Sequence, residues 1–250
     1  MGMGEKFITV TDRPAPDSVI TFPRHPPAGV PIRVIGDVHG DARAFTHAVT
    51  TDRFIIQLGD LTDGGPENGE VLRIMLNLLH QGRGLFLLGN HDLRLARRLA
   101  GRSVRPDPTL EETCAQIDTL HIPQIINAIA HAPAWIVSGN RIFLHGGFHT
   151  DMLHTAPPFP VPIQDGRVHG VLARALYGEP TGQLQPDGYP ERSLRWVDRI
   201  PKNLIVYCGH DNRSPDGRPL TMYGQRGGTA IFLDTGAGKG GHLSWIDLDS

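Results

Sequence analysis

IRVIGDVHG, at residues 32–40, is a short apolar strand that ends at a glycine and an aspartate. FIIQLGD at 54–60 and LFLLGN at 85–90 repeat the pattern, again ending at a glycine beside an acid or an amide. Residues 41–50 and 67–81 lie between these strands, and the second segment carries apolar residues at helical spacing. This alternation of strands and helices predicts an α/β fold whose first strands are parallel.

The remainder of the chain predicts a continuation of this domain. Helices are expected at 93–99, 109–118 and 123–131, a hairpin at 135–144, and strands at 204–207, 230–233 and 242–247, the last two joined by a glycine-rich turn. Residues 150–190 contain seven prolines, which predict a long connection with at most a helix near 171–176. We expect residues 1–30 to be a turn-rich leader and residues 31–250 to be one domain.

Composition excludes several classes of protein. The 250 residues carry a formal net charge of −2, which excludes a protein that coats a polyanion and predicts no extended nucleic-acid surface. No apolar run reaches the roughly 18 residues of a membrane span. Cys114 and Cys208 are the only cysteines and lie far apart, so a disulfide framework is not expected. A cytoplasmic protein fits these features.

Polar side chains follow five predicted strands, each beside a glycine. They are Asp37 and His39, Asp60 and Asp63, Asn90 and His91, His145, and His210. One such aspartate is usually a turn or cap residue, and one such histidine is usually structural. The repetition at five strand ends favours a shared site, because loops at the carboxyl ends of parallel strands converge on one crevice. Carboxylate and imidazole groups without thiolate suit Mn²⁺, Fe, Zn²⁺ or Mg²⁺, and a pair of such ions is typical of phosphoester hydrolysis.

The ordered set of motifs resembles a known family. GDVHG (36–40), GDLTDGG (59–65), GNHD (89–92), HGG (145–147) and GH (209–210) are similar to the signature of the PPP-type phosphoprotein phosphatases, within the calcineurin-like metallophosphoesterases. The resemblance covers residues 32–247 and is nearest to small bacterial members, which include diadenosine tetraphosphatases and the phosphatase domain of polynucleotide kinase-phosphatases. It implies the calcineurin-like sandwich, in which central mixed β-sheets are flanked by helices.

The resemblance also implies a role for each motif residue. Asp37 and His39 would hold a first metal ion, Asp60 would bridge, and Asn90, His145 and His210 would hold a second. His91 would protonate the leaving oxygen, oriented by Asp63. The implied cofactors are two divalent ions, with Mn²⁺ expected first and Fe, Zn²⁺ or Mg²⁺ as alternatives.

Three positions depart from the family pattern. Gly64 stands where the family usually has an arginine that binds phosphate, and we expect Arg94, Arg97, Arg174 or Arg195 to replace it. Asp92 stands where glutamate is usual, with little expected effect, and Asn212 favours the phosphoprotein-phosphatase type. The segment GAGKG at 236–240 lacks the spacing and the Ser or Thr of a phosphate-binding P-loop, so it predicts a turn.

Three functions fit these motifs. The first is a protein phosphatase acting on phosphoserine or phosphothreonine. The second is a hydrolase of dinucleoside polyphosphates or of nucleic-acid phosphate ends, and Phe148, Phe159, Tyr177 and Tyr189 could contact such a substrate. The third is a metal-binding module with weakened catalysis, which rests on Gly64 alone. The expected partner is a phosphorylated protein or a nucleotide, and the oligomeric state is left open.

Overall fold

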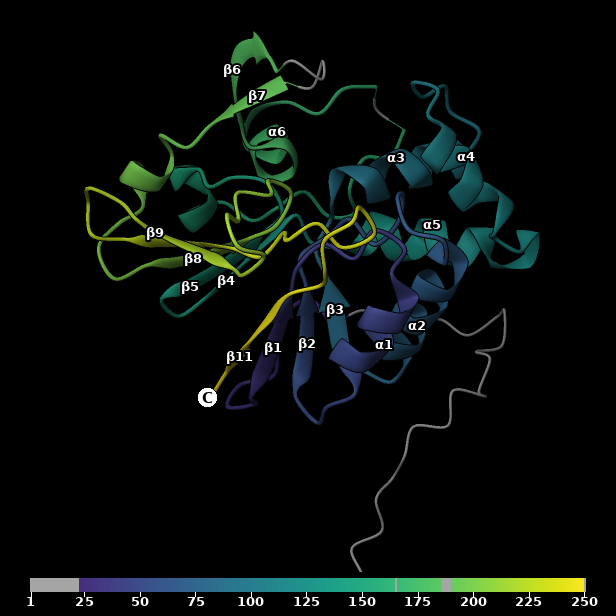
Figure 1. The fold of residues 1–250 in the computed structure, drawn as a ribbon, viewed down its shortest axis with the longest axis horizontal. Helices are drawn as coiled ribbons and strands as arrows, with labels where there is room; N and C mark the ends of the chain where they lie inside the picture. Colours follow the sequence, from purple (N-terminus) through teal and green to yellow (C-terminus); the bar gives the residue numbers. More distant parts are fainter. Residues whose placement is uncertain (1–22, 165, 186–189, 250) are drawn as a thin grey trace, which may run out of the picture.

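The computed structural model describes residues 23–164, 166–185 and 190–249. Its first sheet has the strand order β11–β1–β2–β3 (Figure 1). β1 (Ile32–Ile35), β2 (Phe54–Gln57) and β3 (Gly84–Phe86) are parallel, and β11 (Trp245–Leu248) pairs antiparallel with β1. The parallel order of β1 to β3 confirms the prediction from the first motifs.

The second sheet has the strand order β4–β5–β8–β10–β9. Its strands are β4 (Trp135–Ser138), β5 (Arg141–Leu144), β8 (Ile205–Cys208), β9 (Leu220–Tyr223) and β10 (Thr229–Phe232). β4 and β5 form the predicted hairpin, whereas β5, β8 and β10 are parallel to one another. The carboxyl ends of β5 and β8 therefore lie on the same side of this sheet. β9 was not predicted, because its alternating residues are only partly buried.

Helices account for most of the chain between β1 and β4. They are α1 (Ala42–Val49), α2 (Asn68–His80), α3 (Asn90–Leu99), α4 (Pro108–Ala115), the 3₁₀ turn η1 (Thr119–His121) and α5 (Ile122–His131). The Asp41 side chain caps α1 by accepting a hydrogen bond from the Ala44 backbone, and Pro108 opens α4, where a missing N–H costs nothing. α3 begins three residues earlier than predicted, because its first turn is made by the motif residues from Asn90 onward.

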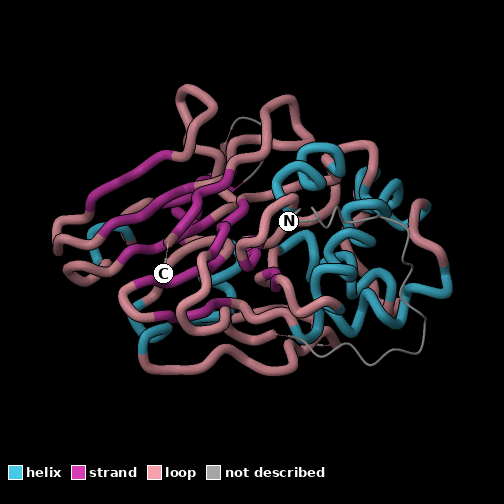
Figure 2. The backbone as a smooth tube through the Cα atoms, turned by 90° about the horizontal axis from the view of Figure 1, so that it is seen from below, coloured by secondary structure: helices cyan, strands magenta, loops and turns pink. Residues whose placement is uncertain are grey.

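The two sheets pack face to face around an inner apolar layer. Val34 and Ile56 from the first sheet meet Phe143 and Tyr207 from the second, and all four are at most 3% exposed. Alternate residues such as Ile35 point outward and pack under the helices, as the two-residue period of a strand requires. Figure 2 shows most of the strands gathered in one part of the molecule and most of the helices in the other. The predicted α/β sandwich with mixed sheets and flanking helices is confirmed.

The predicted helix near 171–176 is confirmed by α6 (Gly170–Tyr177), but the expectation that the rest of 150–190 is an irregular connection was wrong. This segment and its continuation hold η2 (Thr150–Leu153), α6 (Gly170–Tyr177), and a hairpin of β6 (Glu179–Leu184) and β7 (Pro190–Ser193), followed by η3 (Val197–Arg199). The hairpin was missed because β6 and β7 are mostly exposed and carry no apolar alternation. Residues 1–22 of the expected leader lie outside the described residues, and residues 23–30 form turns and bends.

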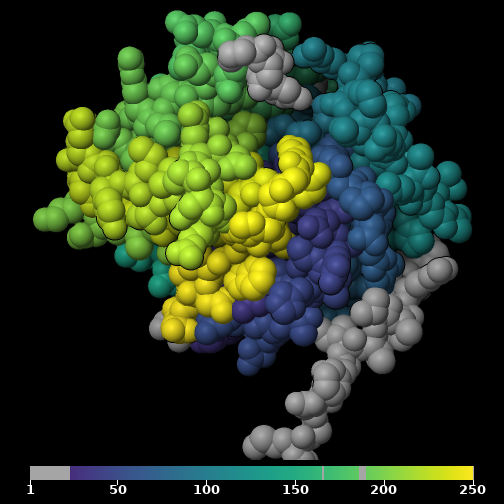
Figure 3. All heavy atoms as spheres, viewed as in Figure 1, coloured from purple at the N-terminus to yellow at the C-terminus, as the bar shows by residue number. Residues whose placement is uncertain are grey.

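The last two strands belong to different sheets, which corrects the expectation of a simple turn between them. β10 lies inside the second sheet and β11 at the edge of the first, so residues 233–244 cross from one sheet to the other. Figure 3 shows this yellow C-terminal segment lying between the purple-blue N-terminal part and the green part of the surface. The glycine-rich residues 236–241 are therefore placed where the two sheets meet.

Gly36 lies at a close approach of the two sheets. A Cβ atom at this position would lie 2.2 Å from the Leu233 carbonyl oxygen, just after β10. We expect Gly36→Ala to lower the free energy of unfolding by about 2 kcal/mol, since overpacking against backbone cannot be relieved by a side-chain rotation. Urea unfolding measures this loss. Gly166→Ala is the matched control, because nothing lies within 4 Å of the added Cβ atom there; equal stability of the two variants would contradict the prediction.

Two further observations bear on the class of protein. Cys114 and Cys208 are both free thiols, as the sequence predicted. In the part of the chain that the structure describes, no helix combines the length and apolar character needed to cross a membrane.

Candidate metal centre

The loops after β1, β2, β3, β5 and β8 carry the motif residues, and these five strands come from both sheets. The backbone of these loops is unusual. Five described non-glycine residues have positive φ, and four of them are His39, Asp60, Asp63 and His210. Aspartate and histidine tolerate this left-handed conformation better than most residues, although it still costs energy. Strained backbone concentrated in these loops is typical of a functional site.

Asp37 is held by the backbone of the loop after β8. The backbone N–H of His210 donates to both carboxylate oxygens of Asp37, at 3.1 and 3.0 Å. Gly209 makes this approach possible, because a Cβ atom there would lie 1.9 Å from Asp37 Oδ1. Gly209 must therefore be a glycine, because the Asp37 carboxylate, which follows β1, packs directly against it.

Asp60 lies at the centre of the cluster. Its Oδ2 atom is 3.3 Å from His145 Nε2, 3.8 Å from His39 Nε2 and 3.9 Å from His91 Nε2. The loop that carries Asp60 is fixed by Asp92, whose carboxylate accepts hydrogen bonds from the backbone N–H groups of residues 60, 61 and 89. Three backbone donors to one buried carboxylate explain why an acid follows His91 in the motif.

The imidazole rings are oriented by backbone carbonyls. Nδ1 of His39 lies 3.0 Å from the Thr62 carbonyl oxygen and 2.9 Å from that of Asp63, and Nδ1 of His145 lies 2.9 Å from the Leu58 carbonyl oxygen. An Nδ1–H that donates to a carbonyl leaves the Nε2 lone pair directed at the cluster. This is the arrangement that metal-binding histidines show in proteins.

The possible ligand atoms form two groups that share Asp60. Those of His39, Asp60 and His91 all lie within 4.8 Å of one another, as do those of Asp60, His145 and His210. Asp37 Oδ2 lies 3.8 Å from His39 Nε2, beside the first group. Asn90 Oδ1 lies 3.1 Å from His145 Nε2, beside the second. All six residues expected as metal ligands therefore meet in one place, with Asp60 common to both groups.

The charges of the cluster favour a bound cation. Burial raises the pKa of Asp37 well above its usual value, and repulsion from the Asp234 and Asp60 carboxylates raises it further. Burial alone would lower the pKa of His145, but the charges of Asp60 and Asp37 raise it to about 10. Carboxylates that are buried together and repel one another require positive charge nearby. The donor set therefore fits divalent ions.

Lys239 supplies one positive charge to this cluster and was not predicted as a site residue. Its Nζ atom lies 2.9 Å from His39 Nε2, so an ammonium group already occupies the neighbourhood of the first ligand group. Gly64 packs against the same glycine-rich segment, because its Cβ position lies 3.3 Å from the Gly238 carbonyl oxygen. Lys239 therefore brings a positive charge close to residue 64, where the family usually has an arginine.

His91 and Asp63 form a hydrogen-bonded pair at the edge of the cluster. Asp63 Oδ2 accepts from His91 Nδ1 at 2.8 Å and from Arg94 at 2.7 Å, and Oδ1 accepts from the Thr113 hydroxyl at 2.7 Å. Burial would raise the pKa of Asp63, but these hydrogen bonds hold it below its usual value. The ionised carboxylate fixes the imidazole so that Nε2 faces Asp60.

Three of the four arginines proposed for substrate lie in different positions. Arg94 pairs with Asp63 and, at 2.6 Å, with Asp107. Arg174 pairs with Glu179 at 2.7 Å, and its side chain passes beside Gly147. Arg195 is exposed. The structure therefore brings Arg94 to the cluster through Asp63, places Arg174 beside the loop after His145, and leaves Arg195 at the surface.

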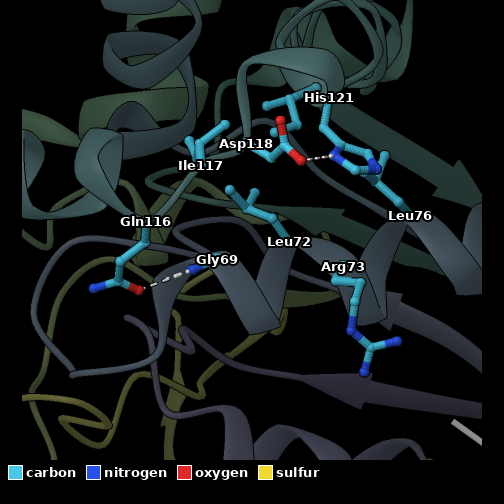
Figure 4. Close-up of a pocket in the computed structure, with 9 residues that line it drawn as sticks. Gly69, Leu72, Arg73, Leu76, Gln116, Ile117, Asp118 and His121 are labelled. Atoms are coloured by element: carbon cyan, nitrogen blue, oxygen red, sulfur yellow. Dashed lines mark hydrogen bonds and ion pairs between the residues drawn. The ribbon is translucent and has the colours of Figure 1, made fainter. Parts of the chain in front are cut away.

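A separate pocket lies between α2 and the segment that joins α4 to α5 (Figure 4). It has a volume of about 270 Å³ and an apolar wall that includes Leu72 and Leu76. Its polar groups satisfy one another: Gln116 accepts from the Gly69 N–H at 3.1 Å, and Asp118 lies 3.9 Å from the His121 ring nitrogen. None of its lining residues belongs to the cluster, so this pocket is not part of the candidate metal centre.

Comparison with known proteins agrees with this geometry. The profile of one protein family, described as calcineurin-like phosphoesterase, matches residues 30–214, which include every motif from β1 to β8. The chain belongs to the calcineurin-like phosphoesterases. Membership confirms the resemblance drawn from the motifs and shows a metal-dependent phosphoesterase domain.

Two curated relatives of this calcineurin-like phosphoesterase share a name. The chain is 28% identical over 237 residues to a bis(5'-nucleosyl)-tetraphosphatase PrpE (asymmetrical) of Geobacillus thermodenitrificans, covering 85% of this chain and 88% of that protein. It is 28% identical over 201 residues to the protein of the same name from Bacillus subtilis, covering 77% of this chain and 74% of that protein.

Solved structures show the same fold. A crystal structure provisionally described as a diadenosine tetraphosphatase superposes with a TM-score of 0.59 at 19% identity, covering 90% of this chain and 96% of that one. A serine/threonine phosphatase from Saccharomyces cerevisiae gives a TM-score of 0.58 at 15% identity, covering 89% of this chain and 80% of that one. At such identities the likeness concerns the fold alone, which is common to enzymes that act on nucleotides and on proteins.

Proposed function

We propose that this calcineurin-like phosphoesterase is a two-metal hydrolase of dinucleoside polyphosphates. The observation that carries the proposal is the cluster in which two ligand groups share Asp60. The sequence ranked a protein serine/threonine phosphatase first, but the curated relatives reported above are named for a nucleotide substrate, and they favour the second function. We further propose that the protein acts in the cytoplasm.

In this proposal the ligand residues keep the roles that the motifs implied. Asp37 and His39 would hold the first ion with Asp60, and Asn90, His145 and His210 would hold the second with the same aspartate. Two divalent ions bound there supply Lewis acidity to the phosphate and lower the pKa of attacking water. Mn²⁺ is the ion we propose first, because the ligands are oxygen and imidazole nitrogen without sulfur.

His91 acts on the leaving group. Its Nδ1 is held by Asp63 at 2.8 Å, so a proton on Nε2 is directed into the cluster beside Asp60. A histidine in this position can donate that proton to the departing oxygen, while Asp63 keeps the ring oriented. Arg94 completes the arrangement by holding Asp63 ionised rather than by contacting the scissile phosphate.

A substrate panel tests the proposed function. The purified chain is given Mn²⁺, with chelator as the control, and is offered p-nitrophenyl phosphate, a phosphothreonine peptide, a 2′,3′-cyclic-phosphate RNA end and diadenosine tetraphosphate. We expect metal-dependent hydrolysis of p-nitrophenyl phosphate and a kcat/KM for diadenosine tetraphosphate at least about tenfold higher than for the other three, which corresponds to about 1.4 kcal/mol. Chromatography of the products should show unequal nucleotides, AMP and ATP.

Each other outcome selects a different function. A phosphothreonine peptide as the fastest substrate restores the protein-phosphatase function, and the RNA end as the fastest substrate indicates a nucleic-acid phosphatase. Two molecules of ADP as the products would support the nucleotide substrate but show symmetrical rather than asymmetrical cleavage. Hydrolysis of no substrate by protein that binds two metal ions supports the weakened metal-binding module.

A further inference from the structure

The glycine-rich turn at residues 236–241 holds Lys239 beside the candidate metal centre. The backbone N–H groups of Lys239 and Gly241 both donate to the Gly236 carbonyl oxygen, at 3.0 and 2.9 Å. Gly236 and Gly238 have φ values of 83° and 67°, which glycine adopts without strain. We call residues 236–241 the lysine turn, because these hydrogen bonds and glycines fix the backbone that carries Lys239.

The lysine turn packs against the backbone of the first ligand group. A Cβ atom at Gly238 would lie 2.0 Å from the His39 carbonyl oxygen, and one at Gly64 would lie 3.3 Å from the Gly238 carbonyl oxygen. The residue directly before Lys239 is therefore in contact with a residue expected to bind a metal ion. The position of Lys239 is thus set by backbone packing as well as by the conformation of its side chain.

The ammonium group of Lys239 reaches the nitrogen of His39 that faces the cluster. Nδ1 of His39 lies beside two backbone carbonyl oxygens and so carries the proton, which leaves the lone pair on Nε2. Lys239 Nζ donates to this Nε2 atom at 2.9 Å. One lone pair cannot serve a metal ion and Lys239 together. When His39 acts as a ligand, Lys239 must therefore donate to another acceptor in the cluster, and a phosphate oxygen is such an acceptor.

Two of the arginines expected to bind phosphate are placed differently. Arg94 meets His91 at Nδ1, 2.9 Å away, and not at the Nε2 atom that faces the cluster. Arg97 Nε donates to the Ile163 carbonyl oxygen at 3.3 Å. Lys239 instead donates to an imidazole nitrogen that faces the cluster. Lys239, rather than either arginine, therefore brings its charge to the side of the rings where the ligand atoms converge.

A lysine side chain is suited to binding phosphate from this position. An ammonium group is a compact charge with three N–H donors, and it binds phosphate oxygens through charge-assisted hydrogen bonds. Lys239 is exposed, and its four-carbon stem can rotate while the lysine turn stays in place. The Nζ atom can therefore move from His39 to a nearby phosphate oxygen without any rearrangement of the backbone.

We propose that the Lys239 ammonium group binds a non-bridging oxygen of the phosphate that is attacked, and so acts as a catalytic residue. This inference rests on the proposed function, because it assigns a residue to the same phosphate, but it concerns any phosphoester that the centre accepts. The transferred phosphoryl group carries negative charge on these oxygens in the transition state. A cation held beside them therefore favours hydrolysis as well as binding.

Lys239→Met tests this role, because it removes the ammonium group and keeps a long unbranched side chain. Lys202→Met is the matched control, since Lys202 is also exposed, lies in the turn before β8 and loses the same charge. Three quantities are measured on the full-length chain. They are the Kd of inorganic phosphate for the Mn²⁺-loaded protein and the Kd of Mn²⁺ for the metal-free protein, both by calorimetry, and kcat/KM for p-nitrophenyl phosphate.

We expect the phosphate Kd to rise and kcat/KM to fall, each by at least about tenfold, in Lys239→Met alone. The Kd of Mn²⁺ should not rise, because the ammonium group competes with the ion for the lone pair of His39. Lys239→Arg keeps the charge and the N–H donors, so it should keep the phosphate Kd within about threefold of the wild-type value.

Three results would overturn the inference. The first is a phosphate Kd in Lys239→Met equal to that of the wild type, and the second is an equally large loss of phosphate binding in Lys239→Arg. The third is a phosphate Kd that rises only together with the Kd of Mn²⁺, since Lys239 would then support the metal centre instead of the phosphate. Lys239→Gln replaces the methionine variant if that variant folds poorly. If diadenosine tetraphosphate is not the preferred substrate, the proposed function fails, and the phosphate titration still decides the role of Lys239.

Discussion

Asp60→Asn is expected to release both metal ions and to abolish hydrolysis. Asp60 Oδ2 lies within 3.9 Å of the Nε2 atoms of His39, His91 and His145, so it is the one oxygen common to both ligand groups. An amide has no charge to bridge two cations, and we expect kcat to fall by at least about 10³. Elemental analysis of the purified variant, alongside kcat for p-nitrophenyl phosphate, measures both effects.

The control for this variant is Asp216→Asn, which makes the same substitution at an exposed loop position. It should keep both ions and full activity. Because Asp60→Asn also removes the ionic partner of His145, its thermal unfolding must be recorded to show that the chain is folded. A folded Asp60→Asn protein that retains two tightly bound ions would refute the bridging role.

His91→Asn is expected to lower kcat by an amount that depends on the leaving group. With an alkyl phosphomonoester, whose departing oxygen needs a proton, kcat should fall by about 10² to 10⁴. With p-nitrophenyl phosphate or a phosphoanhydride the loss should be far smaller, since these groups leave as stable anions. The metal content should stay at the wild-type value, because in our proposal His91 is an acid rather than a ligand.

Asp63→Asn separates orientation from proton donation in this experiment. It removes the charge that holds Nδ1 of His91 at 2.8 Å. We therefore expect kcat to fall more for the alkyl phosphomonoester than for p-nitrophenyl phosphate, as in His91→Asn, but by a smaller factor. His91 is itself one of the three residues of the first ligand group, whose ligand atoms lie within 4.8 Å of one another, so it could also serve as a metal ligand. An equal loss on all substrates, together with loss of an ion, would make His91 a ligand instead of the acid.

The local motifs predicted much of the fold and brought together the candidate residues. β1, β2 and β3 are apolar runs that end at a glycine, and each carries its polar residues within a few positions of the strand end. Such short-range signals survive in the sequence, because the strand and the residues that follow it are adjacent in the chain. Each polar residue alone is weak evidence for a functional site, but the same pattern at five strand ends is strong evidence for one.

Features that depend on distant segments were not predicted. The β6–β7 hairpin has little buried surface and so no apolar alternation. Residues 233–244 cross between sheets, and only that crossing brings Lys239 to 2.9 Å from His39 Nε2. The glycine-rich segment with one lysine is visible in the sequence, but its spacing does not match a P-loop. The sequence therefore predicts only a turn there.

The choice of substrate was also beyond the motifs. Metal ligands and the His91–Asp63 pair serve a phosphoprotein and a nucleotide equally well. What differs is the surface beyond the attacked phosphate, and here that surface is built by α3 and the segment after it. Arg97 was one of several arginines that could replace the missing phosphate ligand, and Arg102 and Arg105 carry no motif of their own. The cavity that these three residues line is visible only in three dimensions.

The number of metal ions required per chain for hydrolysis of diadenosine tetraphosphate tests the central claim most directly. Metal-free protein is titrated with Mn²⁺ while bound metal and product formation are measured in the same samples. The account predicts that activity saturates at two ions per chain, disappears with chelator and never develops in Asp60→Asn. Full activity at one ion per chain, or activity that survives complete removal of metal, would contradict it.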